Sequence, residues 1–181
     1  MGFIDFLSKL FGNKSQRDLK EITPWVERVK ELYPEIDALS NDELRGRTAA
    51  LRQRIQDYVP SERAEVESLK ASIDGKDLDQ REAIWAQVDK LEKEILDKLE
   101  LVLDEIHPEA FAIVKSTGRR FAEAPELRVA ATDFDRELSV THDFVRIEGD
   151  TAVYQNHWVA GGNEITWDMV HYDVQLFGGV V

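Results

Sequence analysis

The stretch "DLDQREAIWAQVDKLEKEILDKLELVLDE", residues 77–105, decides the fold class of this chain. Its large apolar residues recur every three or four positions, which predicts a long helix with one apolar face for a partner helix. They are Ile84, Val88, Leu91, Ile95, Leu99 and Val102. A matching apolar face lies just upstream, before the turn signal Asp74-Gly75, and consists of Val66, Leu69 and Ile73. We therefore expect a helical hairpin over residues 58–105, and favour this mate over a coiled-coil partner from another chain.

Helical signals also precede the hairpin. Thr23 and Pro24 are the residue types of an N-cap and a first helical position. Ser40 and Glu43 form a capping box, which predicts the start of a second helix. Together these signals predict a helical scaffold over residues 15–57.

The chain after the hairpin changes character. Pro108 and Gly118 predict a separate short helix over residues 106–120. Residues 121–167 then lose the helical period and gain β-branched and aromatic residues around two glycine turns, which predicts a small antiparallel β meander. The acids of "DFD", at 133–135, are expected on one strand face, with solvent screening their repulsion. The predicted fold class is α+β, mainly helical.

The first residues predict an amphipathic helix over residues 1–14, ending at Gly12-Asn13. Its apolar face consists of Phe3, Phe6, Leu7 and Leu10. A helix this short is marginal in water by itself, so it must dock on something. One interpretation seats the aromatic residues at a lipid surface with Lys9 facing anionic headgroups. The other folds the helix back onto the chain's own core, and the pattern alone does not decide between them.

Composition excludes several kinds of site. The 181 residues include no cysteine, which excludes disulfides and thiolate metal ligands, and no apolar run approaches the roughly 20 residues of a membrane span. The net charge of −13 argues against nucleic acid as the main partner. The four histidines are scattered, and no GxxxxGK[ST] phosphate loop is present. We therefore assign no catalytic residue and no metal site.

The last residues carry the one candidate binding site. Asp173 is a candidate N-cap that places Gln175 in the first turn of a helix. A carboxamide offers a donor and an acceptor that match the edge of adenine, while Met169 and Tyr172 could pack on its ring. On residue types alone, a capped helix start with a satisfied glutamine is the favoured alternative.

Four blocks of the chain resemble the N-terminal part of the SecA family, the motor ATPases of bacterial preprotein translocation. They are "FLSKLFGNKSQRDLK" (6–20), "ALSNDELRGRTAALRQRI" (38–55), "HPEAFAIVKSTGRR" (107–120) and "HYDVQLFGG" (171–179). The resemblance implies an N-terminal fragment that stops before the phosphate-binding loop, with residues 168–181 beginning a RecA-like nucleotide-binding domain. It implies that Gln175 senses adenine, with Met169 and Tyr172 as neighbours, and that the whole protein uses ATP with magnesium.

The resemblance also implies a function for the parent protein: ATP hydrolysis coupled to the export of preproteins through the SecYEG channel. The opening helix would contact anionic phospholipid and the channel, which places the protein in the cytoplasm, peripherally bound to the inner membrane. The segments 58–105 and 121–167 look like insertions of unassigned role. We expect the isolated chain to hydrolyse no ATP and to bind no nucleotide stably.

Two further readings stay open. The chain could be a non-enzymatic membrane-surface or helix-bundle interaction module whose "DVQLFGG" end is structural. Self-association is also left open. The reading frame beyond Val181 distinguishes a motor from a module, because only the motor requires a phosphate-binding loop within a few tens of residues.

Overall fold

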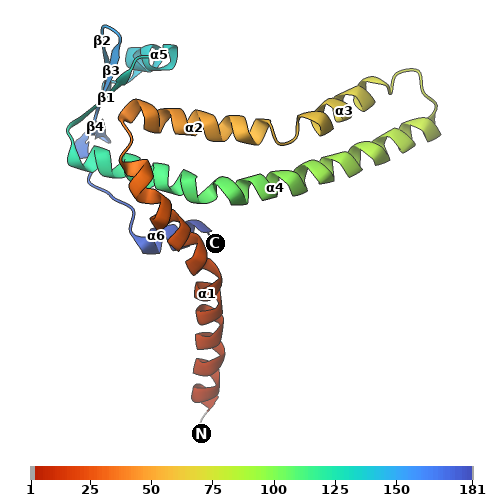
Figure 1. Ribbon diagram of the computed structural model, residues 1–181, viewed down its shortest axis with the longest axis horizontal. Helices are drawn as coiled ribbons and strands as arrows, with labels where there is room; N and C mark the ends of the chain where they lie inside the picture. Colours follow the sequence, from red (N-terminus) through yellow and green to blue (C-terminus); the bar gives the residue numbers. More distant parts are fainter. Residues whose placement is uncertain (1–2, 181) are drawn as a thin grey trace. The chain divides into compact units, whose positions relative to one another are not determined.

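The computed structural model describes the backbone of residues 3–180 and the side chains of residues 20–180. Its helices are α1 (Phe3–Asp37), α2 (Asn41–Gln56), α3 (Pro60–Ala71), α4 (Leu78–Glu123), α5 (Asp133–Thr141) and α6 (Asp173–Val180) (Figure 1). Its strands are β1 (Glu126–Ala130), β2 (Val145–Glu148), β3 (Thr151–Gln155), β4 (His157–Ala160) and β5 (Asn163–Thr166). The predicted class, α+β and mainly helical, is confirmed. No helix in the described part of the chain is long and apolar enough to cross a membrane.

The chain forms two compact units. Residues 46–107 make the hairpin unit, and residues 1–45 together with 108–181 make the second unit, which contains the sheets and α6. Each unit is described by itself.

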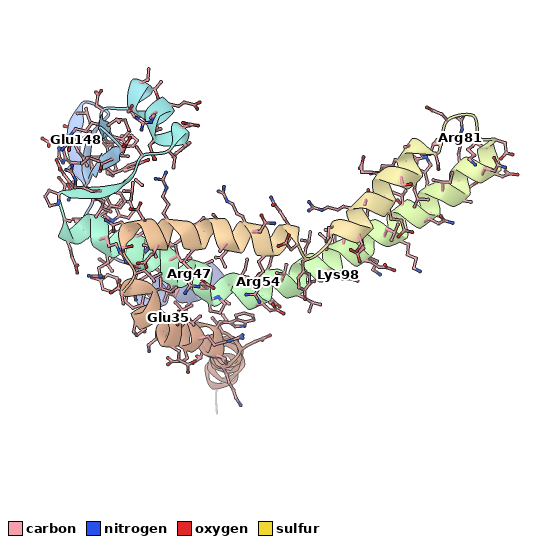
Figure 2. All side chains as sticks on the ribbon, turned by 45° about the horizontal axis from the view of Figure 1, so that its top comes forward. Glu35, Arg47, Arg54, Arg81, Lys98 and Glu148 are labelled. Carbon is pink, nitrogen blue, oxygen red and sulfur yellow. The ribbon has the colours of Figure 1, made fainter. Side chains whose placement is uncertain are left out.

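In the hairpin unit, α3 and the first part of α4 run antiparallel and are joined through Gly75, whose φ of 77° suits a glycine. Val66 of α3 and Val88 and Val102 of α4 are buried within this unit. Ion pairs join α4 to the other two helices: Lys70 with Glu92 and Lys98 with Glu62 link α3 to α4, and Arg54 with Glu105 links α2 to α4. Figure 2 labels Arg54 and Lys98 on their helices. Because the unit is only two helices thick, it buries one side of α4 and leaves the others in water.

Two predicted helix boundaries are wrong. α1 is continuous, with no end at Gly12-Asn13 and no new start at Thr23-Pro24, and it runs through Pro24 and Pro34. A proline inside a helix costs about 3 kcal/mol because one hydrogen bond is lost. Val26, Val29 and Ile36 are almost completely buried nearby, and their packing offsets that cost.

The separate helix predicted over residues 106–120 is likewise part of a longer one, because α4 continues through Pro108 to Glu123. Pro108 is fully buried, between the buried Ile106 and Ala112. Gly118 does not end the helix. It lies where the chain before α6 passes close by: a Cβ there would be 3.5 Å from the Met169 carbonyl oxygen and 3.6 Å from Nδ1 of His171.

The region predicted as a meander differs in two ways. It contains a helix, α5, between β1 and β2, and its three-stranded sheet has the order β1-β3-β2, all antiparallel. The chain therefore crosses over through α5 before β3 fills the centre. β4 and β5 form a separate hairpin around Gly161 and Gly162, both with positive φ. The core of the larger sheet is Ala152, Val153 and Val145.

The "DFD" stretch is not on a strand face. Asp133 begins α5, and Thr132 is its N-cap in a reciprocal capping box with Asp135. Asp135 is fully buried rather than screened by solvent. The Thr-x-x-Asp spacing that starts this helix stands in the sequence, so the local signal was available.

Candidate functional site

The first turn of α6 is organised by Gln175. The Tyr172 N–H donates to Oε1 of Gln175 at 2.7 Å, and the Tyr172 carbonyl accepts from the N–H groups of Gln175 (2.9 Å) and Leu176 (3.2 Å). Tyr172 is therefore the N-cap, and Gln175 is the third helical residue that reaches back to it. The prediction that Asp173 is the cap is wrong by one residue: Asp173 begins the helix.

Asp173 has a different role at this helix start. Its carboxylate lies 3.6 Å from Nζ of Lys30 in α1 and 3.8 Å from Nζ of Lys115 in α4. The Lys115 ammonium also lies 5.5 Å from the centre of the Tyr33 ring. Together with the burial of Leu176, these contacts hold α6 against α1, as Figure 1 shows. The negative side chain also suits the positive end of the helix dipole.

Gln175 keeps unused hydrogen-bonding capacity. Its Oε1 has one lone pair left after the bond to Tyr172. Within residues 20–180, the partner of its Nε2 is the Met169 sulfur, a weak acceptor 4.0 Å away. Gln175 is exposed, as are Met169 (42 %) and Tyr172 (73 %). The structure thus brings the three predicted residues together on an open surface, with the carboxamide held in one orientation.

The predicted membrane- and channel-contacting residues cannot be placed in the same way. The side chains of Phe3, Phe6, Leu7, Lys9 and Leu10 lie outside the described residues. Their role stays a prediction.

A second polar cluster, which the sequence did not reveal, surrounds Asp135. Both carboxylate oxygens accept from Arg45 at the start of α2, at 2.7 and 2.9 Å. The carboxylate also accepts from the N–H and hydroxyl of Thr132, both at 2.7 Å, and from the hydroxyl of Tyr154 in β3. We call these four residues the Asp135 cluster.

The environment of the Asp135 cluster fixes its charges. Burial disfavours a charged carboxylate, but the hydrogen bonds from Arg45, Tyr154 and Thr132 outweigh it and hold the pKa of Asp135 far below its usual value. Burial and the bond to Asp135 raise the pKa of Tyr154 to about 12. Every group of the cluster is engaged in a hydrogen bond or an ion pair. The cluster is therefore an anchor between α2, α5 and the sheet.

Two arginines of the "HPEAFAIVKSTGRR" block make a similar anchor. Arg119 pairs with Asp37 at 2.8 Å and donates to the Tyr33 hydroxyl at 3.1 Å. Arg120 donates to the carbonyls of Leu39 (2.6 Å) and Asp37 (3.2 Å), so both residues tie the end of α1 to α4. Each arginine lies about 80 residues from its hydrogen-bond partner in the sequence. Residue spacing alone therefore did not reveal that the two arginines join α1 to α4.

No group of acidic or histidine side chains in the described residues has the geometry of a metal site.

Comparison with known proteins decides the family. The SecA DEAD-like domain family matches residues 7–181. The chain belongs to the SecA family. The protein translocase subunit SecA of Porphyromonas gingivalis is 71 % identical to it over 181 residues, that of Parabacteroides distasonis 66 % over 181, and that of Flavobacterium psychrophilum 46 % over 183. Each alignment covers the whole chain but only 16 % of the relative's length. No solved structure matches the chain.

These alignments run through both segments that look like insertions. Because the matches to the Porphyromonas and Parabacteroides proteins span all 181 residues, the hairpin and the sheet region are shared with those relatives.

Proposed function

We propose that this chain is the N-terminal part of a SecA-type translocase ATPase, in which residues 168–181 begin a RecA-like nucleotide-binding domain. Family membership supports the motor assignment, since the relatives are named protein translocase subunits. The observation that carries the site is the oriented Gln175 carboxamide, exposed beside Met169 and Tyr172.

The geometry suits a purine. The bond from the Tyr172 N–H fixes the Gln175 amide, so its Nε2 can donate to a ring nitrogen while the second lone pair of Oε1 accepts from an exocyclic amino group. That donor–acceptor pair matches adenine and mismatches guanine, whose corresponding edge carries two acceptors. A thioether and an aromatic ring nearby supply apolar contact.

In the whole protein, ATP bound with magnesium would drive export of preproteins through the SecYEG channel. The start of α1 would contact anionic phospholipid and the channel through Phe3, Phe6, Leu7, Leu10 and Lys9, which gives a cytoplasmic protein held peripherally at the inner membrane. The support for these partners is the sequence resemblance and the amphipathic pattern of residues 1–14. The isolated chain is expected to hydrolyse no ATP.

The test must separate nucleotide recognition from helix capping, because Gln175 does the second already. In the full-length protein, Gln175→Glu keeps an oxygen to accept the Tyr172 N–H but removes the Nε2 donor, whereas Gln175→Ala removes both. We expect both variants to raise the KM for ATP roughly tenfold, since one bidentate base contact contributes about 1–3 kcal/mol of discrimination. Both should also narrow the preference for ATP over GTP.

Thermal unfolding provides the control. Gln175→Glu should keep the parent melting temperature, while Gln175→Ala should lower it through the lost cap. A Gln175→Glu variant with unchanged KM and unchanged ATP preference would show that Gln175 is only a cap. Absence of any ATP turnover by the full-length parent would instead favour the alternative, a non-enzymatic interaction module with a structural C-terminal helix.

A further inference from the structure

The sheet-bearing segment 121–167 leaves the end of α4 and returns to it, and one buried residue joins its two ends. The last carbonyls of a helix have no partner within the helix, and Nδ2 of Asn156 donates to one of them, the Phe121 carbonyl, at 3.1 Å. The Asn156 N–H donates to the Pro125 carbonyl at 3.0 Å. At the other end, the Trp167 N–H donates to the Asn156 carbonyl at 2.7 Å. Because Asn156 is buried, these bonds hold the exit of the segment close to its entry.

The side chain of Trp167 attaches this exit directly to α4. Its indole Nε1–H donates to the Gly118 carbonyl at 3.0 Å. An indole nitrogen can only donate, and a helix carbonyl keeps a second lone pair beyond its bond within the helix. Trp167 is thus held at two points, by its backbone on Asn156 and by its side chain on Gly118. The position and direction of the chain at residue 167 are therefore fixed relative to the last turns of α4.

Gly118 also contacts the residues that follow Trp167. A Cβ on Gly118 would lie 3.5 Å from the Met169 carbonyl oxygen and 3.6 Å from Nδ1 of His171. An alanine would fit at these distances, but a larger side chain would need the space that the Met169 carbonyl and the His171 ring occupy. Nδ1 of His171 is buried and has no hydrogen-bond partner in the part of the chain whose side chains are described. At this atom the contact with Gly118 is one of close packing.

These contacts lie directly before the candidate purine site. Met169 follows Trp167 by two residues, which span at most about 7 Å. The Met169 sulfur lies 4.0 Å from Nε2 of Gln175. A shift of the chain at residue 167 would therefore move Met169 away from the carboxamide that it packs beside.

We propose that Trp167 and Gly118 are positioning residues for the purine site, and that their hydrogen bond fixes Met169 beside Gln175. This inference rests on the proposed function of Gln175 as the adenine contact. Both residues act through Met169 rather than on the nucleotide itself. Segment 121–167 thereby acquires a role: closed on itself by Asn156, it delivers the chain to the site in one position, as a binding site held by supporting hydrogen bonds requires.

Steady-state ATPase kinetics of the full-length protein test the hydrogen bond. Trp167→Phe keeps an aromatic ring but removes the Nε1 donor, so it should raise the KM for ATP about threefold to tenfold, the range expected for one lost hydrogen bond. The kcat at saturating ATP should change less, and the preference for ATP over GTP should narrow. Trp158→Phe in β4 is the matched control, because the Trp158 indole donates no hydrogen bond to any residue of 20–180. Equal effects of the two substitutions on KM and on nucleotide preference would overturn the proposal.

A double-mutant cycle tests whether Trp167 acts through the Gln175 site. In the Gln175→Glu background, Trp167→Phe should raise the KM for ATP by less than about twofold, because the contact that it positions is already lost. Effects that simply multiply would show that Trp167 acts independently of Gln175. If Gln175→Glu alone changes nothing, the proposed function fails and takes this inference with it. If Gln175→Glu raises KM and Trp167→Phe does not, only this inference fails.

Two substitutions at Gly118 test the close approach without removing a donor. Gly118→Ala adds a Cβ at ordinary contact distance, so the KM for ATP should stay within about twofold of the parent. Gly118→Leu must displace Met169 and His171, and should raise KM at least about fivefold. Alanine and leucine both form helices better than glycine, so a weakened α4 does not explain such a rise, and far-ultraviolet circular dichroism checks the helix content. A Gly118→Leu variant with the parent KM and ATP preference would refute the positioning role.

Discussion

Asp135 and Gln175 are both polar side chains near the start of a helix. They differ in how much of their hydrogen-bonding capacity the surrounding structure leaves unused. Asp135 is buried and accepts hydrogen bonds from Arg45, Thr132 and Tyr154. Gln175 is exposed and uses one of its oxygen lone pairs for capping, with Nε2 left to a weak sulfur acceptor. A satisfied polar group stabilises the fold, whereas a positioned group with spare donors can bind a ligand.

Removing one partner of the Asp135 cluster should have the largest effect on stability. Asp135→Ala leaves the half-buried Arg45 guanidinium without its bidentate partner, and each lost hydrogen bond to a charged group costs about 1.5–3 kcal/mol. Urea denaturation measures the loss. Asp133→Ala, in the same turn of α5 but exposed, should change the free energy of unfolding by less than about 0.5 kcal/mol. Similar losses in the two variants would show that the cluster is not an anchor.

The depressed pKa of Asp135 predicts the pH range in which its contribution to the free energy of unfolding is lost. The unfolded chain protonates aspartate near pH 3.9, and the folded cluster binds that proton only at lower pH. The stabilisation is therefore complete above about pH 5 and is lost as the pH falls below 4 toward the folded pKa. The difference in unfolding free energy between the parent and Asp135→Asn should shrink from pH 6 to pH 3. A difference that stays constant would contradict the depressed pKa.

Local patterns in the sequence predicted the elements that they control. The apolar period of residues 77–105 and the turn at Gly75 correspond to α4 and its junction with α3, and the two glycine turns correspond to the joins between β2 and β3 and between β4 and β5. Continuity through Pro24 and Pro108 was missed, because buried packing from distant segments outweighs a local helix breaker. Tertiary contacts routinely override such propensities.

For the candidate site too, the sequence predicted the arrangement of residues that are close in the chain but not the contacts between distant residues. Met169, Tyr172 and Gln175 are close in sequence, so their proximity follows from the chain itself. The Arg45–Asp135 pair joins residues 90 positions apart, and no spacing rule connects them. The capping role of Gln175 was weighed only as a general alternative, since assigning it to Tyr172 rather than Asp173 required the helix boundary.

Alanine substitutions at the two glycines of α6 should give the smallest changes in the free energy of unfolding, and the two changes should have opposite signs. A Cβ on Gly179 would lie 2.5 Å from the edge of the Phe111 ring, so Gly179→Ala forces that ring to move and should cost about 1–3 kcal/mol. Among the residues whose side chains the structure describes, no atom lies within 4 Å of a Cβ on Gly178. Alanine is also the better helix former, so Gly178→Ala should stabilise by about 0.5–1 kcal/mol.

Thermal unfolding of the two alanine variants measures this contrast. Because Gly179 contacts Phe111 of α4 while Gly178 does not, opposite shifts in melting temperature would show that α6 is docked in solution as the structure has it. If both substitutions raise the melting temperature, α6 does not lie against Phe111 in the isolated chain. The orientation of Gln175 would then have to be set by neighbours outside these 181 residues, since a helix of eight residues is marginal without tertiary packing.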